Sequence, residues 1–357
     1  LVALYLHGRE DMWQRNQSSD QLAYSGDFAI EDASSYADFL RGNSSDKANY
    51  YAVIMYEAII DNVDEMKAGS TEISIADYAP SADFNEMYDY VFQASAGALS
   101  CLRLDNPELF WLDFSGVSIM TATSGSRVID IKFTKDGGFY DSNISSQSQI
   151  NSMVSAFENA VDTIIASIPD GYNDYQKVVY LNDYLVYNVE YDTTYVAPFV
   201  HTAYGALVNK VAVCDGYSYA LSVLLDELNI VNLPGVGFAY DDYQNTSVGH
   251  AWSYVKLYDN WYGTDVTWND PVLIGYPPLQ EQEYIEAHKH DYLLKGGNEE
   301  QQTGFYAGGR IVKNYIFSIS DITLEFDVPT IMETDFVFPT IDSIAESYER
   351  EADRITS

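Results

Sequence analysis

The spacing of apolar residues predicts alternating helices and strands in the first half of the chain. Apolar side chains recur every three or four positions, as on one face of a helix, over residues 51–66, 85–104 and 150–168. Residues 117–123 and 128–133 are predicted to be two strands joined by a short turn, because the second run alternates apolar with polar side chains. This half is therefore expected to mix helices with a pair of strands.

The second half predicts further helices followed by three strands. Residues 174–189 have helical spacing, and an apolar stripe follows Cys214, which is therefore expected at a helix N-terminus. The pair Asp259-Asn260 is a suitable hairpin turn between the last two strands. The three runs with strand character, which we expect to form an antiparallel meander, are residues 236–240, 250–258 and 261–268.

The amino-acid composition predicts an acidic surface. Lys and Arg number 18 against 54 Asp and Glu, so the formal net charge is −36. Such a surface repels nucleic acid and anionic lipid, and we exclude both as partners. A basic peptide is compatible with it, although a solvated acidic surface that aids solubility is the simpler interpretation. No stretch reaches the roughly 18 apolar residues of a membrane-spanning helix.

The cysteines and histidines narrow the candidate chemistry. Two cysteines are too few for a disulfide framework, but a single Cys101–Cys214 bridge is left open. No Cys-x-x-Cys pair is present and the five histidines are scattered, so no metal site and no cofactor is predicted. The first residue is Leu rather than Met, and we expect the chain to derive from a longer precursor whose N-terminus is absent here.

Cys214, His250 and Asp265 are, in this order, the residue types of a nucleophile, its base and the group that orients the base. The free amides and positive dipole end of a helix N-terminus stabilise a thiolate, which favours Cys214 as the nucleophile. Each residue alone has an ordinary explanation: a buried structural cysteine, a strand-end histidine and a turn aspartate. The three together on these elements favour a catalytic triad.

The register of the predicted hairpin decides whether His250 and Asp265 lie on the same face. An even-length loop places both on one face of the sheet, whereas a three-residue loop places them on opposite faces. A turn about residues 259–260 leaves Asp265 some four residues from His250. A turn about residues 258–259 sets it nearer, opposite Trp252. Contact between the two side chains then needs additional twist or a bulge.

Four short motifs follow one another in this half of the chain. They are Tyr-Gly-Ala-Leu at 204–207, Val-Cys-Asp-Gly-Tyr at 213–217, Gly-His-Ala-Trp at 249–252, and Trp-Tyr followed by Asp-Val-Thr-Trp within 261–268. In this order and spacing they resemble the core of the bacterial transglutaminase-like superfamily, over roughly residues 175–271. Residues 105–112 are also similar to a segment that precedes the core in such bacterial proteins.

The resemblance implies an α+β, papain-like fold, in which a helix bearing the cysteine packs on an antiparallel sheet bearing the histidine and the aspartate. It implies Cys214 as nucleophile, His250 as base and then acid, and Asp265 as the orienting residue. Tyr204 is our candidate for a side-chain donor to the oxyanion, with Trp252 as the alternative. Tyr204 has a second interpretation as a core aromatic residue that braces the helix.

Together these observations predict an N-terminal accessory α/β region over residues 1–145, a transglutaminase-like catalytic domain over 146–335 and a polar C-terminal helix or tail over 336–357. The predicted function is thiol-dependent acyl transfer that hydrolyses peptide or isopeptide bonds of a peptide or protein substrate. A cross-linking protein-glutamine γ-glutamyltransferase and a non-catalytic surface-binding module are left open. We expect a bacterial protein, a monomer, that acts outside the cell or at the cell wall.

Overall fold

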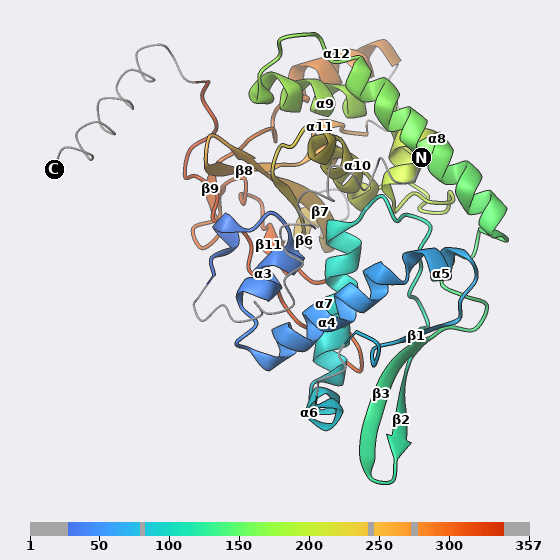
Figure 1. Ribbon diagram of the computed structural model, residues 1–357. Helices are drawn as coiled ribbons and strands as arrows, with labels where there is room; N and C mark the ends of the chain where they lie inside the picture. The colour runs from blue at the N-terminus through green and yellow to red at the C-terminus, as the bar shows by residue number, and fades with distance from the viewer. Residues whose placement is uncertain (1–27, 79–82, 242–245, 273–277, 339–357) are drawn as a thin grey trace. The chain divides into compact units, whose positions relative to one another are not determined.

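A computed structural model describes residues 28–78, 83–241, 246–272 and 278–338, which belong to two compact units (Figure 1). Unit 1 lies within Leu1–Ser155 and Lys313–Val328. Unit 2 lies within Ala156–Val312 and Pro329–Ser357. The predicted C-terminal helix or tail falls, from residue 339 onward, outside the described residues.

Unit 1 combines helices with a small antiparallel sheet. Helices α4 (Lys47–Asp61) and α7 (Val91–Asp105) pack against each other, and α7 is buried around most of its circumference. The sheet has the strand order β1-β3-β2, and its members are β1 (Glu72–Ser74), β2 (Ser118–Ser124) and β3 (Arg127–Thr134). The helical elements are η1 (Ile30–Asp32), α3 (Tyr36–Gly42), α4 (Lys47–Asp61), α5 (Val63–Lys67), α6 (Phe84–Asp89), α7 (Val91–Asp105) and the beginning of α8 (Gln147–Ala166).

The predicted helices and strands of this half are present, but the structure adds α3 and β1, and two of the helices are interrupted. The predicted helices over 51–66 and 85–104 are each divided in two, at Asn62 and at Tyr90. At the first break, Asn62 Nδ2 donates to the Ala58 carbonyl at 2.8 Å. A side chain that bonds to the helix backbone in this way competes with continuation of the helix, so apolar spacing alone overestimates its length.

The segment Lys313–Val328 packs in unit 1, whereas we expected residues up to 335 in the catalytic domain. The Ser100 hydroxyl on α7 accepts hydrogen bonds from the amides of Ile316 (3.2 Å) and Phe317 (3.0 Å). These bonds join residues as many as 217 positions apart, and local spacing carries no signal of such contacts. The predicted domain limits themselves stay a prediction.

Unit 2 contains a four-stranded antiparallel sheet with the order β11-β6-β7-β8. Its strands are β6 (Asn232–Asp241), β7 (Thr246–Leu257), β8 (Asn260–Thr264) and β11 (Ile311–Val312). Helix α10 (Cys214–Glu227) packs on β6 and β7, and α9 (Asp174–Asn188) packs against α10. A cysteine-bearing helix on an antiparallel sheet is the predicted α+β fold class. The shorter elements are β4 (Glu190–Tyr191), η2 (Gly205–Asn209), β5 (Val211–Ala212), α11 (Val266–Asn269), α12 (Pro278–His288), β9 (Gly297–Asn298) and β10 (Thr303–Gly304).

The β7–β8 hairpin has an even, two-residue loop. Tyr258 and Asp259 form it with φ values of 50° and 65°, the left-handed conformation that a tight hairpin turn of this kind requires. Ser253 pairs with Thr264, so the next residue, Asp265, continues opposite Trp252. The turn about 258–259 is therefore the one that forms, and the turn predicted at Asp259-Asn260 is wrong by one residue.

Strand β8 ends earlier than predicted. It stops at Thr264, and Val266–Asn269 form the short helix α11 instead of continuing the strand to residue 268. Asp265 is the N-cap of this helix, and its Oδ1 accepts a hydrogen bond from the Trp268 amide at 3.1 Å. An aspartate cap that satisfies a free helix amide outweighs the strand preference of the residues that follow it.

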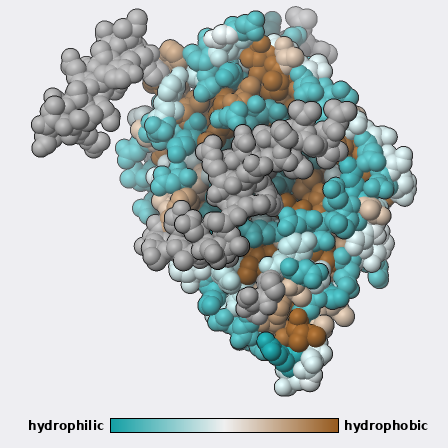
Figure 2. Space-filling view, in the orientation of Figure 1, coloured by the Kyte–Doolittle hydropathy of each residue, from teal (hydrophilic) through white to brown (hydrophobic). Residues whose placement is uncertain are grey.

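Many of the coloured residues on the face shown in Figure 2 are hydrophilic, and apolar residues lie in separate groups among them. This agrees with the excess of carboxylates in the composition. Among the described residues, no helix combines the length and the apolar character needed to cross a bilayer.

Candidate active site

Cys214 is the first residue of α10, half-buried and with a free thiol. The start of the helix lies close to the preceding segment, where the Val213 amide donates to the Val200 carbonyl at 3.0 Å. A Cβ atom at Gly216 would come within 2.4 Å of that carbonyl oxygen, so only glycine permits this approach. Cys101 is also a free thiol, and the bridge left open by the sequence is not formed.

The environment of Cys214 keeps its thiol protonated. Burial raises its pKa to about 12, and the charges of Asp215 and Asp265 act in the same direction. The backbone amides of Ala251 and Asp215 lower the pKa, but burial outweighs them, contrary to the thiolate expected from the helix N-terminus alone. Ala251 directly follows His250 on β7, so its hydrogen bond brings the sulfur to the part of the strand that carries His250.

His250 and Asp265 are in direct contact. His250 Nε2 lies 2.7 Å from Asp265 Oδ2, and the two side chains are only 6% and 0% exposed. Burial would raise the pKa of Asp265, but His250, Arg310 and the Trp268 amide together lower it below its usual value. An ionised carboxylate only accepts hydrogen bonds, so Nε2 carries the donated hydrogen and Nδ1 is the nitrogen left to accept a proton.

Aromatic rings limit the motion of the histidine. The His250 ring stacks on Trp268, with centroids 5.1 Å apart and planes inclined by 22°. Trp252 lies beside it at 6.1 Å, and Trp268 is in turn held edge-on by Tyr292 at 5.0 Å. The imidazole is therefore fixed both by its hydrogen bond to the carboxylate and by packing.

The comparisons with known proteins concern the same part of the chain. A family model of the transglutaminase-like superfamily matches residues 162–266, which contain all three predicted triad residues. This part of the chain is a transglutaminase-like domain. No curated protein matches the chain.

Two solved structures are similar to the chain at low identity. One, from Cytophaga hutchinsonii and provisionally named a cysteine protease, is 14% identical over 43% of this chain and 62% of its own, with a TM-score of 0.27. The other, named a TGase, is 14% identical over 49% of each chain, with a TM-score of 0.29. The chain thus spans less than two thirds of the length of either structure.

Arg310 is a further residue of the candidate site. Its side chain is fully buried, its Nη2 donates to Asp265 Oδ2 at 2.5 Å and its Nη1 donates to the Phe305 carbonyl. The guanidinium carbon lies 4.3 Å from the Trp268 ring centroid and 4.0 Å from that of Phe305. Sequence reasoning missed Arg310, because an arginine that follows the Gly308-Gly309 turn carries no local pattern that names Asp265 as its partner.

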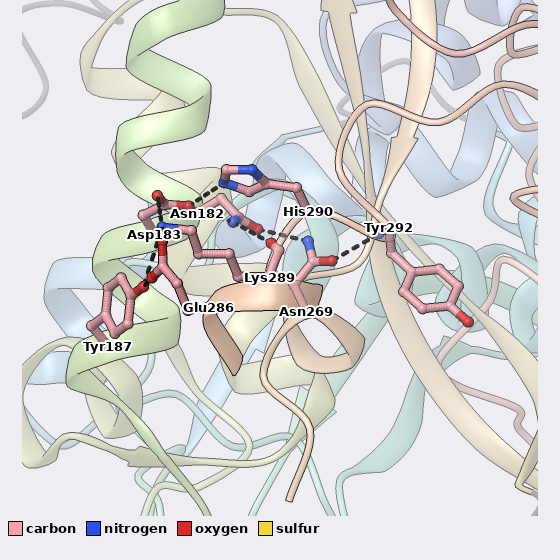
Figure 3. A network of polar contacts seen from close by, with 8 residues as sticks. All are labelled: Asn182, Asp183, Tyr187, Asn269, Glu286, Lys289, His290 and Tyr292. Atoms are coloured by element: carbon pink, nitrogen blue, oxygen red, sulfur yellow. Dashed lines mark hydrogen bonds and ion pairs between the residues drawn. The ribbon is translucent and has the colours of Figure 1, made fainter. Parts of the chain in front are cut away.

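A buried amide network anchors the backbone of Asp265, and Figure 3 shows its members Asn182, Asn269 and Tyr292. The Asp265 amide donates to the Tyr292 carbonyl at 2.9 Å, and the Tyr292 amide donates to Asn269 Oδ1 at 2.8 Å. Asn269 Nδ2 donates to Asn182 Oδ1 on α9, also at 2.8 Å. Both asparagines are fully buried. Sequence reasoning missed them as well, because an asparagine in a helix carries no pattern that names its distant partner.

Ion pairs extend this network toward solvent on the α9 side (Figure 3). Lys289 lies 3.0 Å from Asp183 and 3.2 Å from Glu286, and His290 Nε2 lies 2.6 Å from Asp183. Tyr187 donates to Glu286. Partly exposed pairs of this kind contribute little stability each, but together they hold the segment before Tyr292 against α9.

The two predicted oxyanion donors lie in different surroundings. Tyr204 is half-buried before η2, with its ring edge-on to Phe199 at 5.5 Å, and burial raises its pKa. Trp252 is only 1% exposed, and its Nε1 lies 2.5 Å from where a Cβ of Gly235 would be on the neighbouring strand. The structure brings Trp252 beside His250, and it packs Tyr204 against Phe199. Their role as oxyanion donors stays a prediction.

Proposed function

We propose that the transglutaminase-like domain is a thiol-dependent acyl-transfer enzyme that hydrolyses peptide or isopeptide bonds outside the cell or at the cell wall. The observation that carries this proposal is the His250–Asp265 hydrogen bond, which leaves Nδ1 free, next to the Ala251 amide that reaches the Cys214 sulfur. Cys214 is the nucleophile, His250 the base and then the acid, and Asp265 the orienting residue.

The first half-reaction transfers the acyl group to the cysteine. His250 Nδ1 takes the thiol proton while Cys214 Sγ forms a bond to the carbonyl carbon, and negative charge develops on the carbonyl oxygen. Nδ1 then gives the proton to the departing amine nitrogen, the carbon–nitrogen bond breaks and a thioester remains on Cys214. Asp265 stays ionised and stabilises the transient imidazolium. The free amides at the start of α10 are donors available to the oxyanion.

The second half-reaction releases the acyl group. The neutral imidazole takes a proton from a water molecule while the oxygen of that water attacks the thioester carbon. The carbon–sulfur bond then breaks, and the imidazolium returns the proton to the sulfur. The product is a carboxylic acid. A primary amine in place of water would give a new amide bond, which is the cross-linking reaction.

The test is to trap the acyl-enzyme on the full chain. The protein is incubated with a peptide library, quenched in acid and digested, and the mass of the Cys214 peptide is measured. We expect an acyl adduct on Cys214 and a carboxylic acid product. Cys214→Ala should form no adduct, whereas the matched control Cys101→Ala, which removes the other free thiol, should form it normally.

The same experiment, run with and without an added primary amine, separates the alternatives. If products carry an added primary amine in preference to water, the domain is a cross-linking transglutaminase. If no peptide acylates Cys214, and Cys214→Ala binds peptides as well as the wild type does, the domain is a binding module and the proposal is wrong.

A further inference from the structure

Arg310 is buried beside the proposed triad, yet no step of the reaction above uses it. Its Nη2 and the His250 Nε2 both donate to the same oxygen, Asp265 Oδ2. Its Nε has no hydrogen-bond partner among the described residues. A buried ion pair with an unsatisfied donor is a poor means of gaining stability, because desolvation offsets most of its attraction. The position of this guanidinium therefore calls for another explanation.

The shared oxygen has a consequence for the histidine. An isolated, ionised Asp265 would favour a positive imidazolium next to it, whereas a carboxylate already paired with a guanidinium is close to neutral when seen from the ring. A protonated His250 and Arg310 would also be neighbouring cations on one carboxylate oxygen. Both effects favour the neutral ring before substrate arrives.

Other charged groups around the His250 ring do not take over the role of Arg310 in offsetting the charge of Asp265. Asp215 is engaged by His201, whose Nδ1 lies 3.0 Å from both of its carboxylate oxygens. Strand β6 presents Gly237 opposite His250, which adds no charge. The titratable groups on the elements packed around His250 include Cys214 and Asp215 at the start of α10, Asp265 at the cap of α11, Tyr292, Tyr306 and Arg310.

We propose that Arg310 is a positioning residue of this site, which holds the Asp265 carboxylate on His250 Nε2 and offsets its charge, so that the resting site pairs a neutral imidazole with a neutral thiol. This inference rests on the proposed function, and it specifies the resting state of that site. The nucleophile then forms only during attack, when the sulfur proton passes to Nδ1. The Phe305 carbonyl and the rings of Trp268 and Phe305 hold the guanidinium in place.

The test needs no substrate. The rate of Cys214 alkylation by iodoacetamide is measured by mass spectrometry from acid to alkaline pH, on the folded full chain. In the wild type we expect the rate to rise with pH without a plateau on the acid side. In Arg310→Gln the unbalanced Asp265 charge favours imidazolium beside thiolate, and we expect about a tenfold faster alkylation at mildly acidic pH.

Two further variants separate charge from geometry. Arg310→Lys keeps the charge but loses the planar fork that reaches both Asp265 and the Phe305 carbonyl. We expect it to keep the wild-type pH profile of alkylation and to lower kcat with little change in KM. The matched control Arg127→Gln removes an exposed arginine from β3 and should change neither measurement.

The inference is overturned if folded Arg310→Gln has the wild-type pH profile, which would make Arg310 structural only. Should that variant fail to fold, the wild type alone decides through the ¹⁵N shifts of the His250 ring at neutral pH. A neutral ring protonated at Nε2 is expected, and a doubly protonated ring overturns the inference. If instead peptides never acylate Cys214 while these profiles hold, the proposed function is wrong and the role of Arg310 in setting the charge of the site is retained.

Discussion

Two aspartates, the buried Asp265 and the half-buried Asp270, flank the short helix α11 and differ in their ionisation. Asp265, at its N-terminus, contacts His250 and Arg310, and these partners lower its pKa in spite of burial. Asp270, just after its C-terminus, has the Tyr217 hydroxyl 2.7 Å from its Oδ2, and burial raises its pKa to about 7. The comparison teaches that the charge of the partner, rather than the degree of burial, decides which carboxylate is an ion.

Hydrogen-bond geometry at Asp270 supports the same distinction. The Tyr217 hydroxyl also lies 3.0 Å from the Val189 carbonyl, which can only accept. One hydroxyl hydrogen cannot serve both that carbonyl and an ionised carboxylate. A protonated Asp270 can donate to the tyrosine oxygen while the tyrosine donates to Val189, so every group is satisfied.

The largest expected effect is that of Asp265→Asn, which removes the charge from the first member of the pair. We expect kcat/KM on a peptide substrate to fall by about 10³–10⁴-fold, because an amide neither stabilises the imidazolium nor fixes the ring tautomer. The measurement is steady-state hydrolysis of a peptide identified by acyl-enzyme trapping, with circular dichroism to verify the fold.

Asp270→Asn is the matched control for this substitution, since it makes the same chemical change five positions further along the chain. It should leave kcat/KM within a few-fold of the wild type, because this carboxyl contacts Tyr217 and not the histidine. If a folded Asp265→Asn variant retains most of its turnover, the proposed catalytic role of the Asp265 carboxylate is wrong.

An intermediate effect is expected from Asn269→Ala, which removes the side chain that supports Asp265 from within α11. The Tyr292 amide and the Asn182 carboxamide then lose buried hydrogen-bond partners, so the free energy of unfolding should fall by about 1–3 kcal/mol. Urea unfolding measures this change. The exposed Asn188→Ala on α9 is the control, with an expected change within about 0.5 kcal/mol.

The smallest effect is a pH dependence of stability caused by Asp270. Its pKa is higher in the folded protein, about 7, than the ordinary value of 3.8, so the folded state binds a proton that the unfolded state releases. Its contribution to stability is therefore present below about pH 4 and is lost as the pH rises to about 7. Asp270→Asn should be more stable than the wild type by about 1–2 kcal/mol above neutrality and similar to it in acid, less than the full pKa shift corresponds to because water screens this half-buried carboxyl. Thermal unfolding at several pH values checks this, and parallel curves for the two proteins would contradict it.

Asp265 contributes with the opposite sign. Its pKa is lower in the folded protein, so the stability it provides is present above its ordinary pKa and is lost as the pH falls through the folded value. Lowering the pH should therefore reduce the contribution of Asp265 to stability in the same acidic range where the contribution of Asp270 is largest.

The sequence predicted the parts of this site that local patterns encode. Cys214, His250 and Asp265 lie in short motifs on elements with clear periodicity, and the parity of the hairpin placed two of them on one face. Arg310 and Asn182 were missed because their relevance arises from contacts with residues 45 and 87 positions away. Helix α11 was missed because strand preference was given more weight than an aspartate cap.

The two-residue loop at Tyr258 and Asp259 also determines which insertions and deletions this hairpin can tolerate. Adding or removing a single residue there would rotate everything after the turn to the other side of the sheet, and Asp265 would leave the side of the histidine. Inserting or deleting two residues keeps Asp265 on the side of the sheet that carries His250 and changes only the distance between the two residues along the strands. Length variation among related hairpins should therefore occur in pairs, and loop grafts into this turn should respect that parity.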